Sequence, residues 1–217
     1  MVKRLQAPEI VVTEPEQKKK PAKKAVATDR GGMFSAISSM LKVKSDEQSY
    51  YLLMNEISYE SVQPVIEWIL QCNFAEEKPE QLTLLICSPG GLLSSCYALI
   101  DVMRGSSIPV ATVAIGEIAS AGTMITMNGH PGMRFCTTNT SIMSHTYSSG
   151  AIGKHHELIA AVKDFEMTDK RILATYKRCT GLSEKVIREV LLPVSDVYLT
   201  PEEAKKYRII DHIKDLK

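Results

Sequence analysis

Strand-like and helix-like segments alternate along the chain from Tyr50 onward, and this alternation constrains the fold more than any other feature. Residues 82–91 and 109–117 contain continuous apolar runs with the length of a buried strand, and the first run ends in two glycines. Residues 58–77 and 92–106 place apolar side chains at helical spacing. Strand and helix alternate four or more times, which is typical of a parallel sheet with helices packed on it. We therefore predict an α/β fold with a twisted, mainly parallel sheet.

The second half of the chain continues this alternation with more helix. Residues 120–129 have a helical pattern, residues 132–145 form short predicted strands, and residues 154–180 form one long predicted helix. Residues 181–192 are predicted to be a further helix, and residues 196–213 a turn, a short helix and a final strand. The long helix carries an apolar stripe formed by Leu158, Ala161, Val162, Phe165 and Met167.

The composition is that of one globular domain, with 217 residues of which 44% are hydrophobic and 24% are charged. The formal net charge of +1 gives no indication of nucleic-acid binding. No uninterrupted apolar run approaches the roughly 18 residues of a membrane span, and the first residues lack the long apolar segment of a secretion signal. We expect a cytoplasmic protein that binds neither nucleic acid nor membrane. Its five cysteines are expected to be reduced thiols: Cys72, Cys87, Cys96, Cys136 and Cys179.

Charge is distributed unevenly, and this divides the chain into three parts. Residues 1–30 contain eight Lys or Arg residues against four Asp or Glu residues. We predict a disordered, lysine-rich tail over residues 1–30, a lead-in segment over residues 31–48 and one folded domain over residues 49–217. The tail's composition is compatible with a solubilising extension, a docking tail for an acidic partner or a removable leader.

Two glycine-containing corners follow predicted strands, which is where a parallel sheet gathers its chemistry. The first is SPGG at residues 88–91, and the second spans residues 116–122. Ser120 lies in the second corner, between Ala119 and Ala121. A serine there is either a small packing residue or a nucleophile on a turn, and the corner by itself leaves both interpretations open.

A nucleophilic serine needs a base, and the base works best when an acid orients it. His145 ends a predicted strand that follows Ser120, and Asp196 precedes the last predicted helix. Gly91 and Ala121 lie on the two corners, where their backbone N–H groups can stabilise an oxyanion. A single histidine is more often a packed or surface residue, and an aspartate before a helix is more often a turn or capping residue. The residues alone therefore leave a catalytic and a structural interpretation as alternatives.

Four separated motifs occur in one order and at compatible spacings: CSPGGLLSS, GEIASAGTMI, FCTTNTSIMSH and DVYLTPEEAKKYRIIDHI. Together they resemble the proteolytic subunit of the Clp protease family over about residues 50–214. The resemblance implies that the chain is a divergent member of this family. The resemblance implies a spiral of repeated β-β-α units, shared with crotonases, and a protruding helical handle over residues 148–172. It also implies the site residues: Ser120 as nucleophile, His145 as general base and acid, Asp196 as orienting acid, and Gly91 and Ala121 as oxyanion-hole donors.

The resemblance further implies a hydrolase that works inside an assembly. We expect a serine endopeptidase acting on unfolded polypeptides or short peptides in the chamber of a homo-oligomer, with two stacked heptameric rings forming a tetradecamer. A partner AAA+ ATPase unfoldase would make the proteolysis ATP-dependent. The chain departs from the family pattern at Ala121, where methionine is usual, at Thr146-Tyr147, where Gln-Pro is usual, and in lacking a match for the N-terminal pore loop.

Three other functions remain as alternatives, and the sequence contains no motif for a metal or a nucleotide. A catalytically weak structural or regulatory ring subunit, a crotonase-like acyl-CoA enzyme and a Ser-Lys protease are the rivals to a Ser-His-Asp peptidase. His155 and His156 are adjacent on a predicted helix and point about 100° apart, away from any zinc-type spacing, so no metal is predicted. Neither nucleotide-binding glycine motif is present, so no cofactor is predicted.

Overall fold

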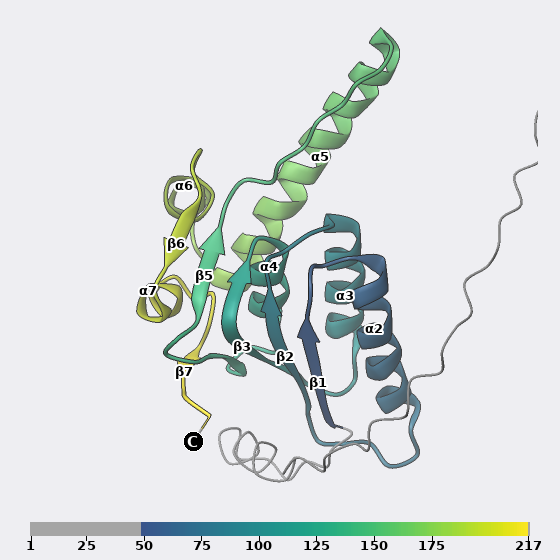
Figure 1. The fold of residues 1–217 in the computed structure, drawn as a ribbon, viewed down its shortest axis with the longest axis vertical. Helices are drawn as coiled ribbons and strands as arrows, with labels where there is room; N and C mark the ends of the chain where they lie inside the picture. The colour runs from purple at the N-terminus through teal and green to yellow at the C-terminus, as the bar shows by residue number, and fades with distance from the viewer. Residues whose placement is uncertain (1–48, 217) are drawn as a thin grey trace, which may run out of the picture.

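The computed structural model describes residues 49–216, and a seven-stranded sheet forms the centre of this part of the chain (Figure 1). The predicted tail over residues 1–30 and the lead-in over residues 31–48 lie outside the described residues. The strands are β1(Tyr50–Met54), β2(Leu82–Ser88), β3(Val110–Ala119), β4(Arg134–Cys136), β5(Ser141–Ser144), β6(Val197–Leu199) and β7(His212–Ile213).

All neighbouring strands in the order β1-β2-β3-β4-β7 are parallel, so the prediction of a mainly parallel sheet is confirmed. Strand β3 changes partner along its length. Its first half pairs with β4 through Thr112–Ala114, and its second half pairs with β5 through Glu117–Ala119. Gly116, with φ +65°, lies between the two halves. Only β6 runs antiparallel to its neighbour, β5, among the strands described.

Helices cover the sheet and fix the carboxyl end of β3. They are α2(Tyr59–Phe74), α3(Leu93–Gly105), α4(Ala121–Met127), α5(His155–Thr180), α6(Glu184–Val186), the π-helical turn η2(Ile187–Leu191) and α7(Pro201–Lys206). All seven residues of α4 are buried. Because each buried aliphatic or methionine side chain contributes about 1.5–3 kcal/mol, this short helix is held firmly despite its length.

Helix α5 has two different halves. Its C-terminal half packs on the body through Ile172, Leu173 and Tyr176, which are buried. Its N-terminal half projects away from the body, as the predicted handle requires (Figure 1). The apolar stripe predicted there is largely uncovered by the chain's own residues, since Val162 is 55% exposed and Met167 is 52% exposed.

The helix predicted over residues 181–192 is present from Glu184 to Leu191, but it is not α-helical throughout. The structure has three α-helical residues followed by the π-helical turn η2, closed by a hydrogen bond from the Leu192 N–H to the Ile187 carbonyl. The carbonyl of Leu191 turns instead toward the side chain of Ser144 on β5. Pro193 follows, and the residue before a proline is disfavoured in the helical region, so the helix ends here.

Within residues 49–216, no helix combines the length and the apolar character that crossing a membrane would require.

Candidate active site

Ser120 lies at a strained corner between β3 and α4. Its backbone has φ +53° and ψ −118°, a conformation that costs a residue with a side chain about 1–3 kcal/mol. Two hydrogen bonds to the Met143 carbonyl hold the corner: one from the Ser120 N–H at 3.1 Å and one from the Thr123 hydroxyl at 2.8 Å. A sharp strand-to-helix turn of this kind exposes the serine hydroxyl beyond the end of the sheet.

His145 follows the last residue of β5, beside this corner. Strand β5 pairs in parallel with the second half of β3, and Ala119 is the partner of Met143 in that register. The two strands therefore end side by side, and the His145 Nε2 atom lies 2.8 Å from the Ser120 Oγ atom.

Asp196 immediately precedes β6, whose residue Val197 pairs with Ser144 on β5. This antiparallel pairing brings the carboxylate next to the imidazole, with 3.2 Å between Asp196 Oδ1 and His145 Nδ1. The Asp196 side chain is 57% exposed and the His145 side chain 20% exposed. The structure thus brings the three predicted residues together, each at a different strand end, through a hydrogen bond between Ser120 and His145 and a close contact between His145 and Asp196.

The glycines of the SPGG corner lie against Ser120. A Cβ atom on Gly91 would lie 2.3 Å from the Ile57 carbonyl oxygen, and a Cβ on Gly90 would lie 2.7 Å from the Ser120 Cβ atom, so neither position accepts a side chain. The Ile57 N–H donates to the Gly90 carbonyl at 2.6 Å and fixes this loop. Among the described residues, the N–H groups of Gly91 and Ala121 have no hydrogen-bond acceptor, which leaves both amides available to a ligand.

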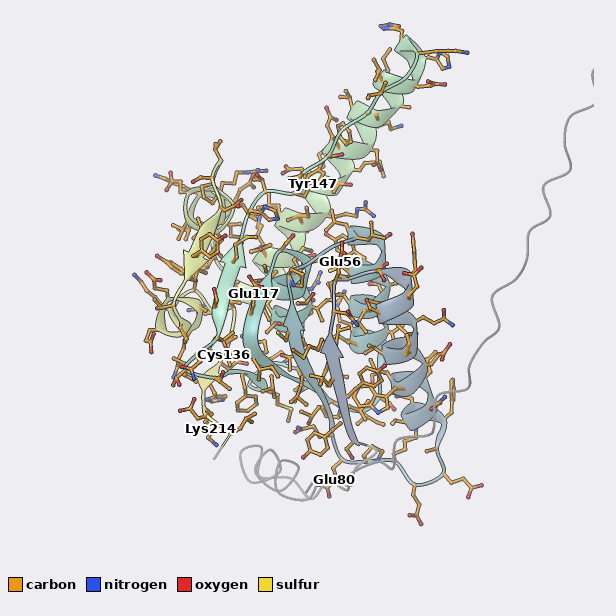
Figure 2. The ribbon with its side chains drawn as sticks, viewed as in Figure 1. Glu56, Glu80, Glu117, Cys136, Tyr147 and Lys214 are labelled. Carbon is orange, nitrogen blue, oxygen red and sulfur yellow. The ribbon has the colours of Figure 1, made fainter. Side chains whose placement is uncertain are left out.

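A cavity of about 900 Å³ opens beside Ser120 and His145. Its walls come from the start of α3, the body-side part of α5 and the segment after His145, where Tyr147 lies at the base of the projecting half of α5 (Figure 2). The lining away from the triad is made by Leu92, Leu93, Ser94, Tyr97, Ala98, Asp101, Tyr147, Ser148, Ser149, Asp164, Phe165, Thr168 and Arg171.

This lining contains polar groups that sequence reasoning missed. The Arg171 guanidinium lies 5.3 Å from the centre of the Tyr97 ring and donates to the Thr168 hydroxyl at 3.1 Å. The Tyr147 hydroxyl donates to the Phe165 carbonyl at 2.9 Å. Burial raises the pKa of Tyr97 and of Tyr147, so both phenols are neutral near pH 7. The spacing of residues 93, 94, 97, 98 and 101 on one face of α3 was the available signal for the part of the lining that this helix supplies.

No three His, Cys, Asp or Glu residues within 49–216 are grouped so that they could hold a metal ion. The site therefore consists of a serine on a strained turn, an imidazole, a carboxylate and two free amides.

Burial raises the pKa of the Cys96 thiol to about 12 and, with the nearby acids Glu202 and Asp215, that of Cys136 to about 12, so neither supplies a thiolate near pH 7.

The sheet is mostly parallel, and the strained turn that carries Ser120 lies at the carboxyl ends of its strands. These two features define the class: an α/β protein with a hydrolase-like site. Residues 35–217 match the family model described as Clp protease. This match covers most of the chain, and the chain belongs to the Clp protease family. It is accordingly a ClpP-type peptidase, of a family whose members form oligomeric rings.

Proposed function

We propose that the chain is a serine endopeptidase that cuts unfolded polypeptides or short peptides with a triad of Ser120, His145 and Asp196. The observation that carries the proposal is the unbroken sequence of contacts from the Ser120 hydroxyl through both ring nitrogens of His145 to the Asp196 carboxylate, at 2.8 Å and 3.2 Å. A serine hydroxyl becomes a competent nucleophile when such a base can take its proton.

The reaction follows from this arrangement. The Nε2 atom of His145 accepts the Ser120 proton while Oγ attacks the peptide carbonyl carbon, and the carbonyl oxygen becomes an oxyanion. The free amides of Gly91 and Ala121 donate to that oxyanion. Breaking the C–N bond releases the amine, which takes the proton from His145. Water, deprotonated by the same imidazole, then hydrolyses the acyl-enzyme and regenerates Ser120.

The proposed working form is a homo-oligomer of two stacked heptameric rings in the cytoplasm, supplied with substrate by an AAA+ ATPase unfoldase. The uncovered apolar side chains on the projecting half of α5 support contact between copies: Leu158 (39% exposed), Ile159 (58%), Val162 (55%) and Met167 (52%). An enclosed chamber restricts cleavage to chains that can enter unfolded.

Replacing the nucleophile tests the proposal. We expect the purified native assembly to cleave fluorogenic peptides and to take up a fluorophosphonate probe at Ser120, and the Ser120→Ala variant to lose both by more than about 1,000-fold. Ser141→Ala, an exposed serine on the adjacent strand β5, is the matched control and should retain both. An intact native assembly that is neither labelled nor active contradicts the proposal and favours the structural ring subunit. Binding of acyl-CoA with no peptide cleavage favours the crotonase-like enzyme.

A further inference from the structure

A buried cluster of polar groups lies directly behind the proposed base. Ser144, the residue before His145, has no exposed surface, and Tyr176 on α5 is 1% exposed. The Ser144 hydroxyl donates to the Leu191 carbonyl at 2.5 Å and lies 2.7 Å from the Tyr176 hydroxyl. Because serine has a single hydroxyl proton, and that proton goes to the carbonyl, Tyr176 donates to Ser144. The order is therefore Tyr176 to Ser144 to Leu191.

This cluster anchors the segment that carries Asp196. Leu191 and Leu192 are buried at its start, but residues 194–196 are exposed and Pro193 is half-buried, so the part next to Asp196 has little packing of its own. Its first end is Leu191, held through its carbonyl by the side chain of Ser144. Its second end is Val197, which pairs with the backbone of the same residue, Ser144. One residue next to the base thus holds both ends of the segment that carries the acid.

The polar nature of the cluster needs a reason. Two buried hydroxyls must be desolvated and are favourable only when fully hydrogen-bonded, whereas apolar side chains of the same size would pack without this requirement. Burial also raises the pKa of Tyr176 to about 12, so its phenol keeps its proton and remains a donor. Leu191 is the last residue of the π-helical turn η2, so its carbonyl has no partner within the helix and is free to accept. Such turns occur frequently at functional sites.

We propose that Ser144 and Tyr176 are positioning residues that hold Asp196 against His145 through the carbonyl of Leu191. This inference rests on the proposed function and deepens it, since neither residue lines the cavity beside Ser120. Loss of either hydroxyl loosens the segment before Asp196 and weakens the contact of its carboxylate with the imidazole. The catalytic step then slows, while substrate binding is unaffected.

The test is a double-mutant cycle with Asp196. Ser144→Ala and Tyr176→Phe are each made in the native chain and in the Asp196→Ala variant, and the rate constant of fluorophosphonate labelling at Ser120 is measured per labelled site. We expect about a tenfold loss in the native background and less than about a twofold further loss in the Asp196→Ala background. The kcat for peptide cleavage should fall by the same factor, with KM changed by less than about twofold.

A purely structural role gives a different result, because a general loss of folded protein lowers the amount of protein that is labelled and leaves the rate constant per labelled site unchanged in both backgrounds. Thr180→Val is the matched control: Thr180 is also buried on α5 and its hydroxyl donates to the Tyr176 carbonyl at 2.7 Å, away from β5 and η2. It should lower stability and leave the labelling rate per site unchanged.

The outcomes separate this inference from the proposed function. Equal losses in both backgrounds, or no loss in the native background, overturn the positioning role while Ser120 remains the nucleophile. A native protein that is not labelled at all overturns both. If Ser144→Ala does not fold, Tyr176→Phe alone decides the matter, because it removes one oxygen atom and keeps the ring in the core.

Discussion

At the scale of single residues, the close approach of two corners sets the geometry around Ser120. Ser120 has a positive φ, and the loop that faces it has glycine at position 90, with φ +100°. A Cβ atom on Gly90 would lie 2.7 Å from the Ser120 Cβ and 2.9 Å from the Ala119 carbonyl oxygen. The missing side chain therefore allows the proposed nucleophile and the proposed oxyanion donors to share one small volume.

A methyl group at position 90 should disable the site. We expect Gly90→Ala to lower the labelling rate at Ser120 by about 100-fold or more, because displacing a reacting group by about 1 Å has an effect of this size. Gly132→Ala is the matched control: Gly132 also has a positive φ, +83°, but a Cβ there meets no atom within 4 Å. Both variants should be less stable, and only Gly90→Ala should lose activity. Equal labelling of the two variants would show that the close contact is unimportant.

The residues of the site differ in how far the sequence reveals them. Ser120 and His145 follow predicted strands, so their meeting at one sheet edge could be anticipated, whereas the place of Asp196, before the last predicted helix, was implied only by the resemblance to the Clp protease family. Ser144 and Tyr176 could not, since their contact joins residues 32 apart in sequence through packing of a helix on a strand end. No spacing rule marks a serine inside a strand as the partner of a helical tyrosine.

At the scale of helices and strands, one guanidinium joins several chain segments at the sheet end opposite the active site. Arg134 on β4 forms two hydrogen bonds with the Asp211 carboxylate before β7, at 2.8 Å and 2.5 Å. It also donates to the carbonyls of Cys179 at the end of α5 and of Arg208 after α7. Arg134 is 7% exposed, so this ion pair is largely shielded from water and its partners depend on one another.

Acid should weaken this junction. Burial alone raises the pKa of Asp211, but the hydrogen bonds and charge of Arg134, with backbone N–H groups, outweigh it and the pKa is lowered. A carboxyl with a lowered pKa stabilises the fold above its unfolded value of about 4, and this contribution is lost as the pH falls through the folded value. We expect the free energy of unfolding, followed by Trp68 fluorescence in urea, to fall between about pH 5 and pH 2.

The Asp211→Asn variant isolates that contribution. It should be less stable than the native protein at pH 7 and should show a smaller change over the same acid range. Glu166→Gln, at an exposed position on α5, is the control and should follow the native curve. If Asp211→Asn lost as much stability in acid as the native protein does, other carboxyls would account for the acid sensitivity.

Helices and strands were predictable from the sequence where the spacing of apolar residues follows one regular repeat. The parallel strands and α2, α3 and α5 follow from apolar runs and helical spacing. The π-helical turn η2 does not, because residues 187–191 are helical in pattern and nothing in that pattern distinguishes a π-helical turn from an α-helical one.

At the scale of the whole molecule, the projecting half of α5 leaves apolar side chains uncovered. Four of them are between 39% and 58% exposed: Leu158, Ile159, Val162 and Met167. Several large apolar side chains left exposed on one projecting segment are typical of an interaction site. We attribute it to contact between copies of the chain, in keeping with the family.

A charge in this stripe should break the assembly. We expect Val162→Glu to reduce the mass of the native particle, measured by native mass spectrometry, to that of single rings or smaller species, because a buried unpaired carboxylate is strongly unfavourable. Lys163→Glu, at the neighbouring exposed position, is the control. It alters the net charge more than Val162→Glu does and should leave the particle mass unchanged. An unaltered particle mass in Val162→Glu would place the ring contacts elsewhere.

The change of partner along β3 divides the sheet into two panels that share one strand. Ser120, His145 and Asp196 all belong to the smaller panel, made by the second half of β3 with β5 and β6. Their mutual alignment is thus a local property of a few residue pairs. Insertions or substitutions at the far rim, around β4 and β7, can therefore leave this alignment undisturbed, so that the outer surface can diverge while the three side chains keep their positions.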